Sequence, residues 1–286
     1  NDGLIQTIGA NNTTIQVNNG ASITNNGNLV ATGAGSEAII AGNDAMIGNT
    51  GLIATDGDDA VAVTVGADSM IDNSGTIMTE GDDADAIVAG DNLDLTNSGT
   101  IAATGADARG IETGDGFMLM NSGTIEATDR AINAGDDVTI TNVAGGLINT
   151  TGDADTIQTG ENTIIINNGT ISNEGFDTKI IDAGDGLTVT NNGTITSDWK
   201  GIEGEANFTL TNNAGALIFS AFDEAVEADG PGLVVVNNGE IISPEDDAID
   251  GDSDVMITNT GLIQGGENDA IELNNGTIIN SGRIIS

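Results

Sequence analysis

The sequence predicts an all-β fold, a parallel β-helix (β-solenoid) with three short strands in each coil. Three observations predict it. One phrase of the type Asn-Ser-Gly-Thr-Ile recurs along the chain, three apolar stretches lie between its copies, and Gly, Asp and Asn separate these stretches. Repeats with periods of about 20 to 50 residues are typical of solenoids and related arrays. We expect one β-solenoid domain over residues 1–286, with about 12 coils of 21 to 24 residues.

A glycine before the first apolar stretch marks the start of each coil. Gly75 and Gly99 are 24 residues apart, and each is preceded by Asn-Ser and followed by Thr-Ile. Because the phrase runs through the whole chain, we expect a segment of a longer array or a unit that stacks end to end. The other expected anchors are Gly3, Gly27, Gly51, Gly123, Gly146, Gly169, Gly193, Gly215, Gly239, Gly261 and Gly282.

The three apolar stretches of a coil are too short for helices. In one coil they begin at Thr76-Ile77, at Ala86-Ile87 and at Leu93-Asp94. Their period of two and their β-branched residues predict strands, and the Gly, Asp and Asn clusters between them predict turns. If the coils stack in parallel, the apolar side chains form three columns, which are Ile77, Ile101 and Ile125; Ile87, Ile111 and Ile132; and Leu95, Leu119 and Ile140.

Asparagine closes the third stretch of successive coils. A side-chain amide carries both donors and an acceptor, so stacked asparagines can bond to the residues above and below them. We interpret this column as a structural ladder rather than a binding site. Its predicted members are Asn73, Asn97, Asn121, Asn142, Asn167, Asn191, Asn212, Asn237, Asn259 and Asn280.

Two columns of acidic residues flank the second strand. Carboxylates one strand apart repel each other, which leaves two interpretations open. Either they are solvated turn residues that accept backbone amides, or Ca²⁺ lies between the coils, bound by Asp91, Asp115, Asp136 and Asp185. No EF-hand loop supports the second interpretation, and no organic cofactor is expected. The first column is Asp59, Asp83, Asp107, Asp129, Asp177, Asp223, Asp247 and Asp269, and the second is Asp91, Asp115, Asp136, Glu161, Asp185, Glu205 and Asp252.

The composition excludes several classes of function. Forty-five acidic and 5 basic residues give a net charge of −40, so nucleic acid and anionic lipid are repelled. The chain has no His and no Cys, and therefore lacks the usual groups of nucleophilic catalysis. Since no apolar run approaches about 18 residues, we expect no direct insertion into a membrane.

Paired aspartates such as Asp58-Asp59 and Asp82-Asp83 are superficially similar to those of pectin-cleaving β-helix hydrolases. Such enzymes need one carboxylate pair around one scissile bond, whereas these two pairs repeat with the coil. A carbohydrate-binding or carbohydrate-active β-helix with an acidic groove is the alternative function. It would need a clustered, non-repeating trio of acids, and we expect none in this chain.

Ser197-Asp198-Trp199-Lys200 departs from the repeat and carries the single Trp. We expect Trp199 to cover the short turn of a slightly contracted coil. The alternative is a contact site, because large aromatic side chains are frequent at interfaces.

The phrases Asn73-Ser74-Gly75-Thr76-Ile77, Asn167-Asn168-Gly169-Thr170-Ile171 and Ala131-Ile132-Asn133-Ala134-Gly135 resemble those of bacterial autotransporter passenger domains and related large surface adhesins. The resemblance implies a right-handed helix, export to the cell surface or medium, and service as a stiff stalk or adhesive rod. We therefore expect a non-enzymatic extracellular structural protein with an acidic exterior. A Ca²⁺-stabilised adhesion solenoid is the second alternative. Expected partners are copies of the chain, flanking solenoid segments, cell-surface polysaccharide or other cells.

Overall fold

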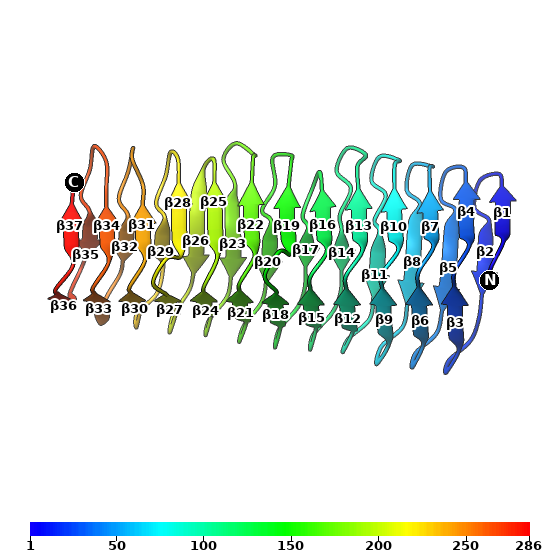
Figure 1. The fold of residues 1–286 in the computed structure, drawn as a ribbon, viewed down its shortest axis with the longest axis horizontal. Coiled ribbons are helices and arrows are strands. Elements are labelled where there is room, and N and C mark those ends of the chain that lie inside the picture. Colours follow the sequence, from blue (N-terminus) through cyan, green and yellow to red (C-terminus); the bar gives the residue numbers. More distant parts are fainter.

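The computed structural model describes residues 1–286 and shows a parallel β-helix (Figure 1). The chain forms 37 strands, and each coil contributes one strand to each of three sheets. Sheet A has 13 strands, whereas sheets B and C have 12 strands each. No segment forms a helix long and apolar enough to cross a membrane. The predicted all-β parallel solenoid of about 12 coils is confirmed.

The strands of the three sheets alternate in chain order. Sheet A contains β1 (Leu4–Ile8), β4 (Asn28–Thr32), β7 (Leu52–Thr55), β10 (Thr76–Thr79), β13 (Thr100–Ala103), β16 (Thr124–Ala127), β19 (Leu147–Thr150), β22 (Thr170–Asn173), β25 (Thr194–Ser197), β28 (Leu217–Ser220), β31 (Glu240–Ile242), β34 (Leu262–Gln264) and β37 (Arg283–Ile285). Sheet B contains β2 (Thr13–Gln16), β5 (Glu37–Ala41), β8 (Val61–Val65), β11 (Ile87–Ala89), β14 (Ile111–Glu112), β17 (Ile132–Asn133), β20 (Ile157–Thr159), β23 (Lys179–Ala183), β26 (Lys200–Gly204), β29 (Val226–Ala228), β32 (Ile249–Gly251) and β35 (Ile271–Leu273). Sheet C contains β3 (Ser22–Asn25), β6 (Met46–Asn49), β9 (Met70–Asn73), β12 (Asp94–Asn97), β15 (Met118–Asn121), β18 (Thr139–Asn142), β21 (Ile164–Asn167), β24 (Thr188–Asn191), β27 (Thr209–Asn212), β30 (Val234–Asn237), β33 (Val255–Asn259) and β36 (Gly276–Asn280).

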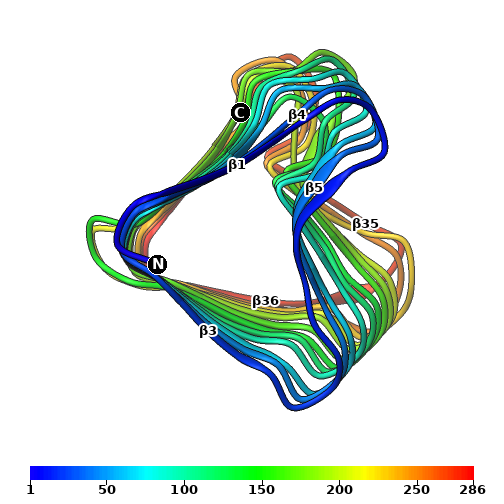
Figure 2. The same ribbon diagram turned by 90° about the vertical axis from the view of Figure 1, so that its right-hand side faces the viewer.

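Every strand pairs in parallel with the strand one coil away. In sheet A, for example, Ile77 of β10 lies opposite Ile101 of β13. Viewed along the axis, the coils superpose and the three sheets enclose the interior (Figure 2). One predicted anchor is wrong: Thr194 pairs with Leu217, which places Ala216 rather than Gly215 opposite Gly193.

The interior is an apolar column that runs through the coils. In most strands, residues alternate between the interior and the surface, as in Thr76–Thr79, where Ile77 and Thr79 are buried. A single cluster of 54 buried apolar residues results, and it includes all three predicted columns. Burial of an Ile or Leu side chain contributes about 1.5 to 3 kcal/mol, so this column is the main stabilising feature of the fold.

Three sets of turns join the sheets, and we call them turns AB, BC and CA after the sheets that they connect in chain order. Asp59 and Asp83 in turn AB and Asn92 in turn BC have φ values of 56°, 53° and 59°. Positive φ is costly for most residues but tolerated by Gly, Asn and Asp. Many acids of the turns are therefore explained by backbone conformation.

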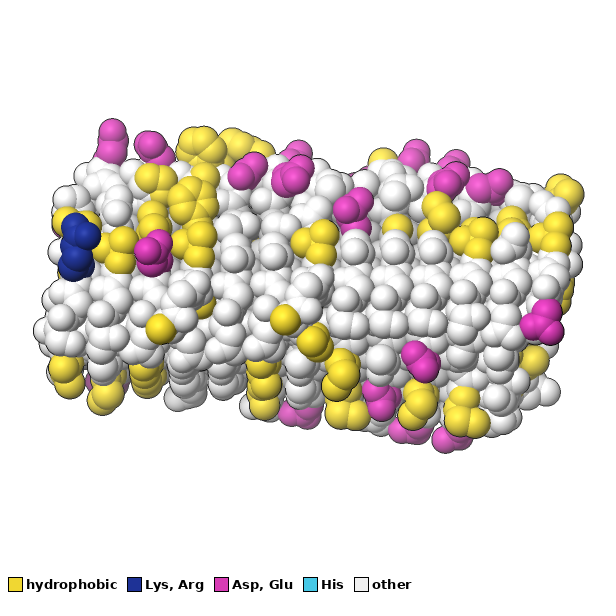
Figure 3. All heavy atoms as spheres, viewed as in Figure 1, with side chains coloured by type: hydrophobic (Ala, Val, Ile, Leu, Met, Phe, Trp, Pro, Cys, Tyr) yellow, Lys and Arg dark blue, Asp and Glu magenta, His cyan; other side chains and the backbone are white.

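The acidic residues occupy one side of the rod. They gather on sheet B and in turns AB and BC, on both sides of that sheet. Figure 3 shows the opposite side, where few acidic side chains interrupt the surface between the upper and lower margins. The acids that do lie on sheets A and C or in turn CA are Asp2, Asp72, Asp94, Glu126 and Glu240.

Candidate binding site

The structure places the ten predicted asparagines in one column at the ends of the sheet C strands. Asn73 Nδ2 donates to Asn97 Oδ1 at 2.8 Å, and Asn97 Nδ2 donates to Asn121 Oδ1 at 2.9 Å. Asn97 Nδ2 also lies 3.1 Å from the carbonyl oxygen of Thr124, in the coil beyond. Because nine of these side chains are buried and bonded to each other, the column offers no surface to a ligand. The ladder also contains Asn25 and Asn49, which the same position before the anchor glycine could have identified.

The four predicted calcium ligands lie in turn BC of separate coils, and their side chains are exposed. Asp91 Oδ1 accepts the backbone amide of Asp115 at 3.2 Å, and Asp115 Oδ1 accepts that of Asp136 at 3.0 Å. Asp185 Oδ1 likewise accepts the amide of Ala206 at 3.1 Å. These carboxylates act as turn acceptors that join one coil to the next. No three of them approach one point, so calcium binding in this column stays a prediction.

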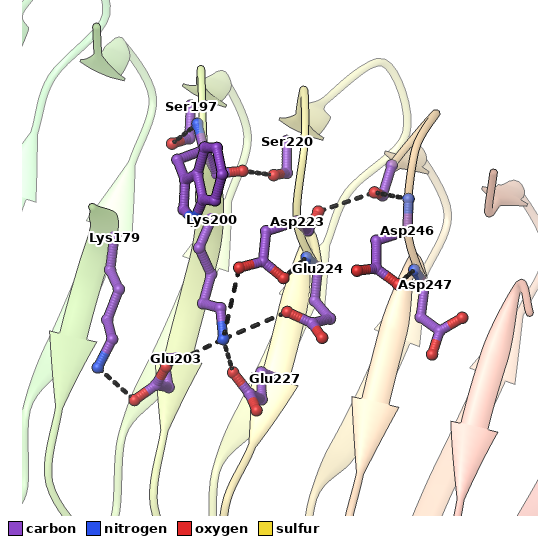
Figure 4. A network of polar contacts seen from close by, with 12 residues as sticks. Lys179, Ser197, Lys200, Glu203, Ser220, Asp223, Glu224, Glu227, Asp246 and Asp247 are labelled. Atoms are coloured by element: carbon purple, nitrogen blue, oxygen red, sulfur yellow. Dashed lines mark hydrogen bonds and ion pairs between the residues drawn. The ribbon is translucent and has the colours of Figure 1, made fainter. Parts of the chain in front are cut away.

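A different cluster of charged residues lies on the outer face of sheet B (Figure 4). Lys200 at the start of β26 contacts Glu227 of β29, and its Nζ lies 3.2 Å from Glu224 and 3.5 Å from Glu203. Lys179, one coil earlier, contacts the same Glu203. Two of the five basic residues of the chain therefore lie in this cluster, both paired with carboxylates. We call this set, together with Asp223, the lysine–carboxylate network.

Acidic side chains from successive coils meet in this network. The carboxylates of Asp223, Glu224 and Asp246 offer oxygens that all lie within 4.8 Å of one another, and so do those of Glu224, Glu227 and Asp250. The expectation that the chain holds no clustered, non-repeating trio of acids is therefore wrong. Turn AB places Asp223 and Glu224 beside the outward-facing side chains of sheet B, and no equivalent group occurs in the other coils.

Burial shifts the protonation of these groups. It raises the pKa of Glu224 to about 8, helped by a hydrogen bond with Asp223, and it raises the pKa of Glu227 to about 7 despite the nearby Lys200. Burial alone would lower the pKa of Lys200, but Glu227 and the other carboxylates raise it above its ordinary value. At neutral pH the network thus contains a charged lysine beside a protonated Glu224.

Three aromatic side chains lie next to the network in turn AB. Phe176, Trp199 and Phe222 occupy successive coils, and their neighbouring ring centroids are 4.3 Å and 5.8 Å apart. Phe176 is 66% exposed and Phe222 is 58% exposed, whereas Trp199 is half-buried between them. We call this set the aromatic column. Sequence reasoning singled out Trp199 alone, although each phenylalanine lies one coil length away from it.

Two small hollows lie beside the network, one next to the aromatic column and one on the outer face of sheet B. One cavity of about 120 Å³ lies between the ring of Trp199 and the lysines, and a groove of about 230 Å³ follows the outer face of β29, β32 and β35. The cavity is lined by Asp177, Thr178, Lys179, Trp199, Lys200 and Asp223. The groove is lined mainly by Glu227, Asp229, Asp250, Asp252, Glu272 and Asn274. The site can therefore offer aromatic faces and carboxylate acceptors to the same partner.

Comparison with known proteins gives one family. Residues 1–196 match the family described as the BigA third pectate lyase-like domain, a domain of bacterial surface proteins. No curated protein and no solved structure matches the chain. The matched segment includes Phe176 but ends before Trp199, Lys200 and Glu224, so the family match covers only part of the site. Because the match extends over more than half of the sequence, the chain belongs to the family of the BigA third pectate lyase-like domain.

Proposed function

We propose that the protein is a non-enzymatic rod of a bacterial surface adhesin, located outside the cell. The observation that carries this proposal is the Asn ladder, which runs with the apolar core through successive coils. Each side chain of the ladder bonds to the next coil, and each strand pairs with the next strand. A shaft of this kind resists bending and separation of its coils. The family of bacterial surface-protein domains supports the same role.

We further propose that the chain belongs to an exported passenger segment of the autotransporter type. The repeated phrase and the lack of cysteine support this more specific identity. Flanking solenoid segments or further copies of the chain would then continue the rod. Cell-surface polysaccharide or other cells are the proposed targets of adhesion.

The chemistry of the network supports a role without catalysis. A lyase needs a neutral base, but the surrounding carboxylates keep Lys200 protonated. Lys200 Nζ also contacts Glu227 and lies 3.2 Å from Glu224, so it fills the space between them. A glycosidic bond would have to occupy that space for hydrolysis by the two carboxyl groups. An acidic polysaccharide would also meet a strongly negative surface.

One observation favours a second candidate, the cleavage of neutral glycans. Glu224 retains its proton to about pH 8, which suits a general acid, and Asp250 lies in the same group of carboxylates. Pairs of carboxyl groups with separated pKa values carry out glycoside hydrolysis. In this mechanism Glu224 would protonate the leaving oxygen while a second carboxylate acts on the opposite face of the sugar.

The two candidates are distinguished by locating the protein and assaying its activity. We expect antibody against the chain to label intact bacteria that express the full-length protein, and deletion of its gene to reduce their adherence. Incubation of purified protein with neutral and acidic polysaccharides should release no reducing ends and no unsaturated products. Release that is lost in Glu224→Gln but kept in the control Glu245→Gln would establish the second candidate. Protein found only inside the cell would overturn the first.

A further inference from the structure

We propose that the aromatic column is a docking surface for an arginine-bearing segment of a partner polypeptide. This site goes beyond the proposed role as a rod, which would still hold if the column bound nothing. The inference depends on the exposure of Phe176 and Phe222, on the position of Trp199 between them, and on the charges around all three.

The exposure of the column is not explained by the needs of the core. Phe117 and Phe208 are fully buried, as expected of phenylalanine in a stacked apolar interior. Phe176 and Phe222 instead point outward, 66% and 58% exposed, from a turn whose coils are already filled by aliphatic residues such as Ile181. Aromatic residues make up only 2% of the chain, yet three of them share this column. Contiguous exposed apolar surface on a soluble protein marks an interaction site.

The charges around the column select a cationic partner. Asp177 and Asp198 are exposed and lie beside Phe176 and Trp199 in sequence. The nearby cations, Lys179 and Lys200, are already paired with carboxylates of sheet B. The column is thus bordered by unpaired negative charge on a rod of net charge −40. Complementary potential favours a positive ligand and excludes polyanions.

The combination of rings and carboxylates favours arginine over other cations. A guanidinium group is planar, stacks on aromatic faces, and donates two parallel hydrogen bonds to one carboxylate. The column presents both features in consecutive coils, since Asp177 follows Phe176 and Asp198 precedes Trp199. A lysine ammonium would also be attracted by the negative charge, but it lacks the planar shape that stacks on a ring and bonds to both oxygens of a carboxylate. A neutral sugar could stack on the rings, but it carries no positive charge to pair with the carboxylates.

The single tryptophan makes the proposal directly testable. We would titrate the full chain with a Gly-Arg repeat peptide while recording Trp199 fluorescence, and repeat the titration with a Gly-Lys peptide of equal length and charge. We expect saturable binding of the arginine peptide, at least about threefold tighter than the lysine peptide, with each of Phe176→Ala and Phe222→Ala weakening it by about threefold. Isothermal titration calorimetry would check that the fluorescence change reports binding.

The control is Met120→Ala, which removes another side chain that is 55% exposed but lies on sheet C. It should leave the affinity unchanged, and all variants should keep the circular dichroism of the parent. Equal binding of both peptides, or binding insensitive to Phe176→Ala, would show general attraction to an acidic surface and overturn the proposal. A fluorescence response to a neutral oligosaccharide but not to the arginine peptide would also overturn it, without affecting the proposed rod.

Discussion

The side-chain amide of Asn97 donates a hydrogen bond to Asn121 at 2.9 Å and accepts one from Asn73 at 2.8 Å. One residue type thus serves as donor and acceptor at the same position of successive coils. The hydrogen bonds between the Asn side chains form only when the next coil keeps the same register. The ladder therefore couples the stability of neighbouring coils.

Replacing Asn97 tests this coupling. Asn97→Ala removes the acceptor of Asn73 and the donor to Asn121 and Thr124, so three polar groups of the ladder each lose a hydrogen bond. We expect a loss of about 1 to 3 kcal/mol in the free energy of unfolding, measured by urea denaturation. Asn192→Ala, which removes an exposed side chain that bonds to Asn168 at 2.9 Å, is the matched control and should change little. Equal effects of the two variants would contradict the role of burial.

Replacement of two glycines by alanine is expected to have opposite effects on stability. A Cβ at Gly99 would lie 2.0 Å from the backbone oxygen of Gly75, whereas a Cβ at Gly48 would meet nothing within 4 Å. Gly99→Ala must push neighbouring coils apart, so we expect a loss of about 2 kcal/mol or more. Gly48→Ala should be neutral or slightly stabilising, because it only restricts the unfolded chain. Thermal unfolding of both variants checks the prediction, and a stable Gly99→Ala protein would refute the close approach of coils.

Stability should fall as the pH rises from about 5 to about 8. Burial raises the pKa of Asp85 and Asp247 to about 6, of Glu227 to about 7 and of Glu224 to about 8. In this range the folded protein keeps protons that the unfolded chain has released, so each step upward in pH favours unfolding. We expect Tm to fall by several degrees between pH 5 and pH 8.5.

The variant Glu224→Gln isolates the effect of the largest of these pKa shifts on stability. The variant cannot lose a proton at this position, so its Tm should depend less steeply on pH than that of the parent. Glu245→Gln, an exposed glutamate of turn AB in the next coil, should retain the parent slope. A Tm that increases toward pH 8.5 in the parent protein would contradict the assignment.

Chelation distinguishes the two interpretations of the acidic column in turn BC, as acceptors of backbone amides or as Ca²⁺ ligands. Because Asp91, Asp115 and Asp185 already accept backbone amides, we expect EDTA to leave the Tm unchanged. Asp115→Asn keeps an acceptor oxygen and should also have little effect. A fall in Tm with EDTA that Ca²⁺ reverses and Mg²⁺ does not would instead establish a bound calcium ion.

The coil architecture could be predicted because residues one period apart must pair. Ile or Leu two residues after each anchor glycine and Asn at the end of the third stretch keep their spacing, so the sequence alone indicates which residues stack. The anchor at Gly215 failed because Asn213-Ala214-Gly215 forms a wider turn, in which Gly215 has a φ of 84°. The next residue, Ala216, then takes the anchor position.

The lysine–carboxylate network was harder to predict. Asp223 and Glu224 belong to a turn whose length varies between coils, while Glu227 and Asp250 project from sheet B. Whether these side chains come close together depends on how turn AB folds over the sheet. The repeat pattern of the sequence does not contain that information. The aromatic column had a usable signal, since Phe176 and Phe222 flank Trp199 at one coil length, but these turns lack the recurring phrase.

The pairing of each strand with the strands one coil away has a consequence for evolution. A duplication or loss of one whole period in the gene leaves the junction between the remaining periods chemically the same. The rod can then lengthen or shorten in single steps, while the turn that carries Trp199 is moved along the rod without being rebuilt.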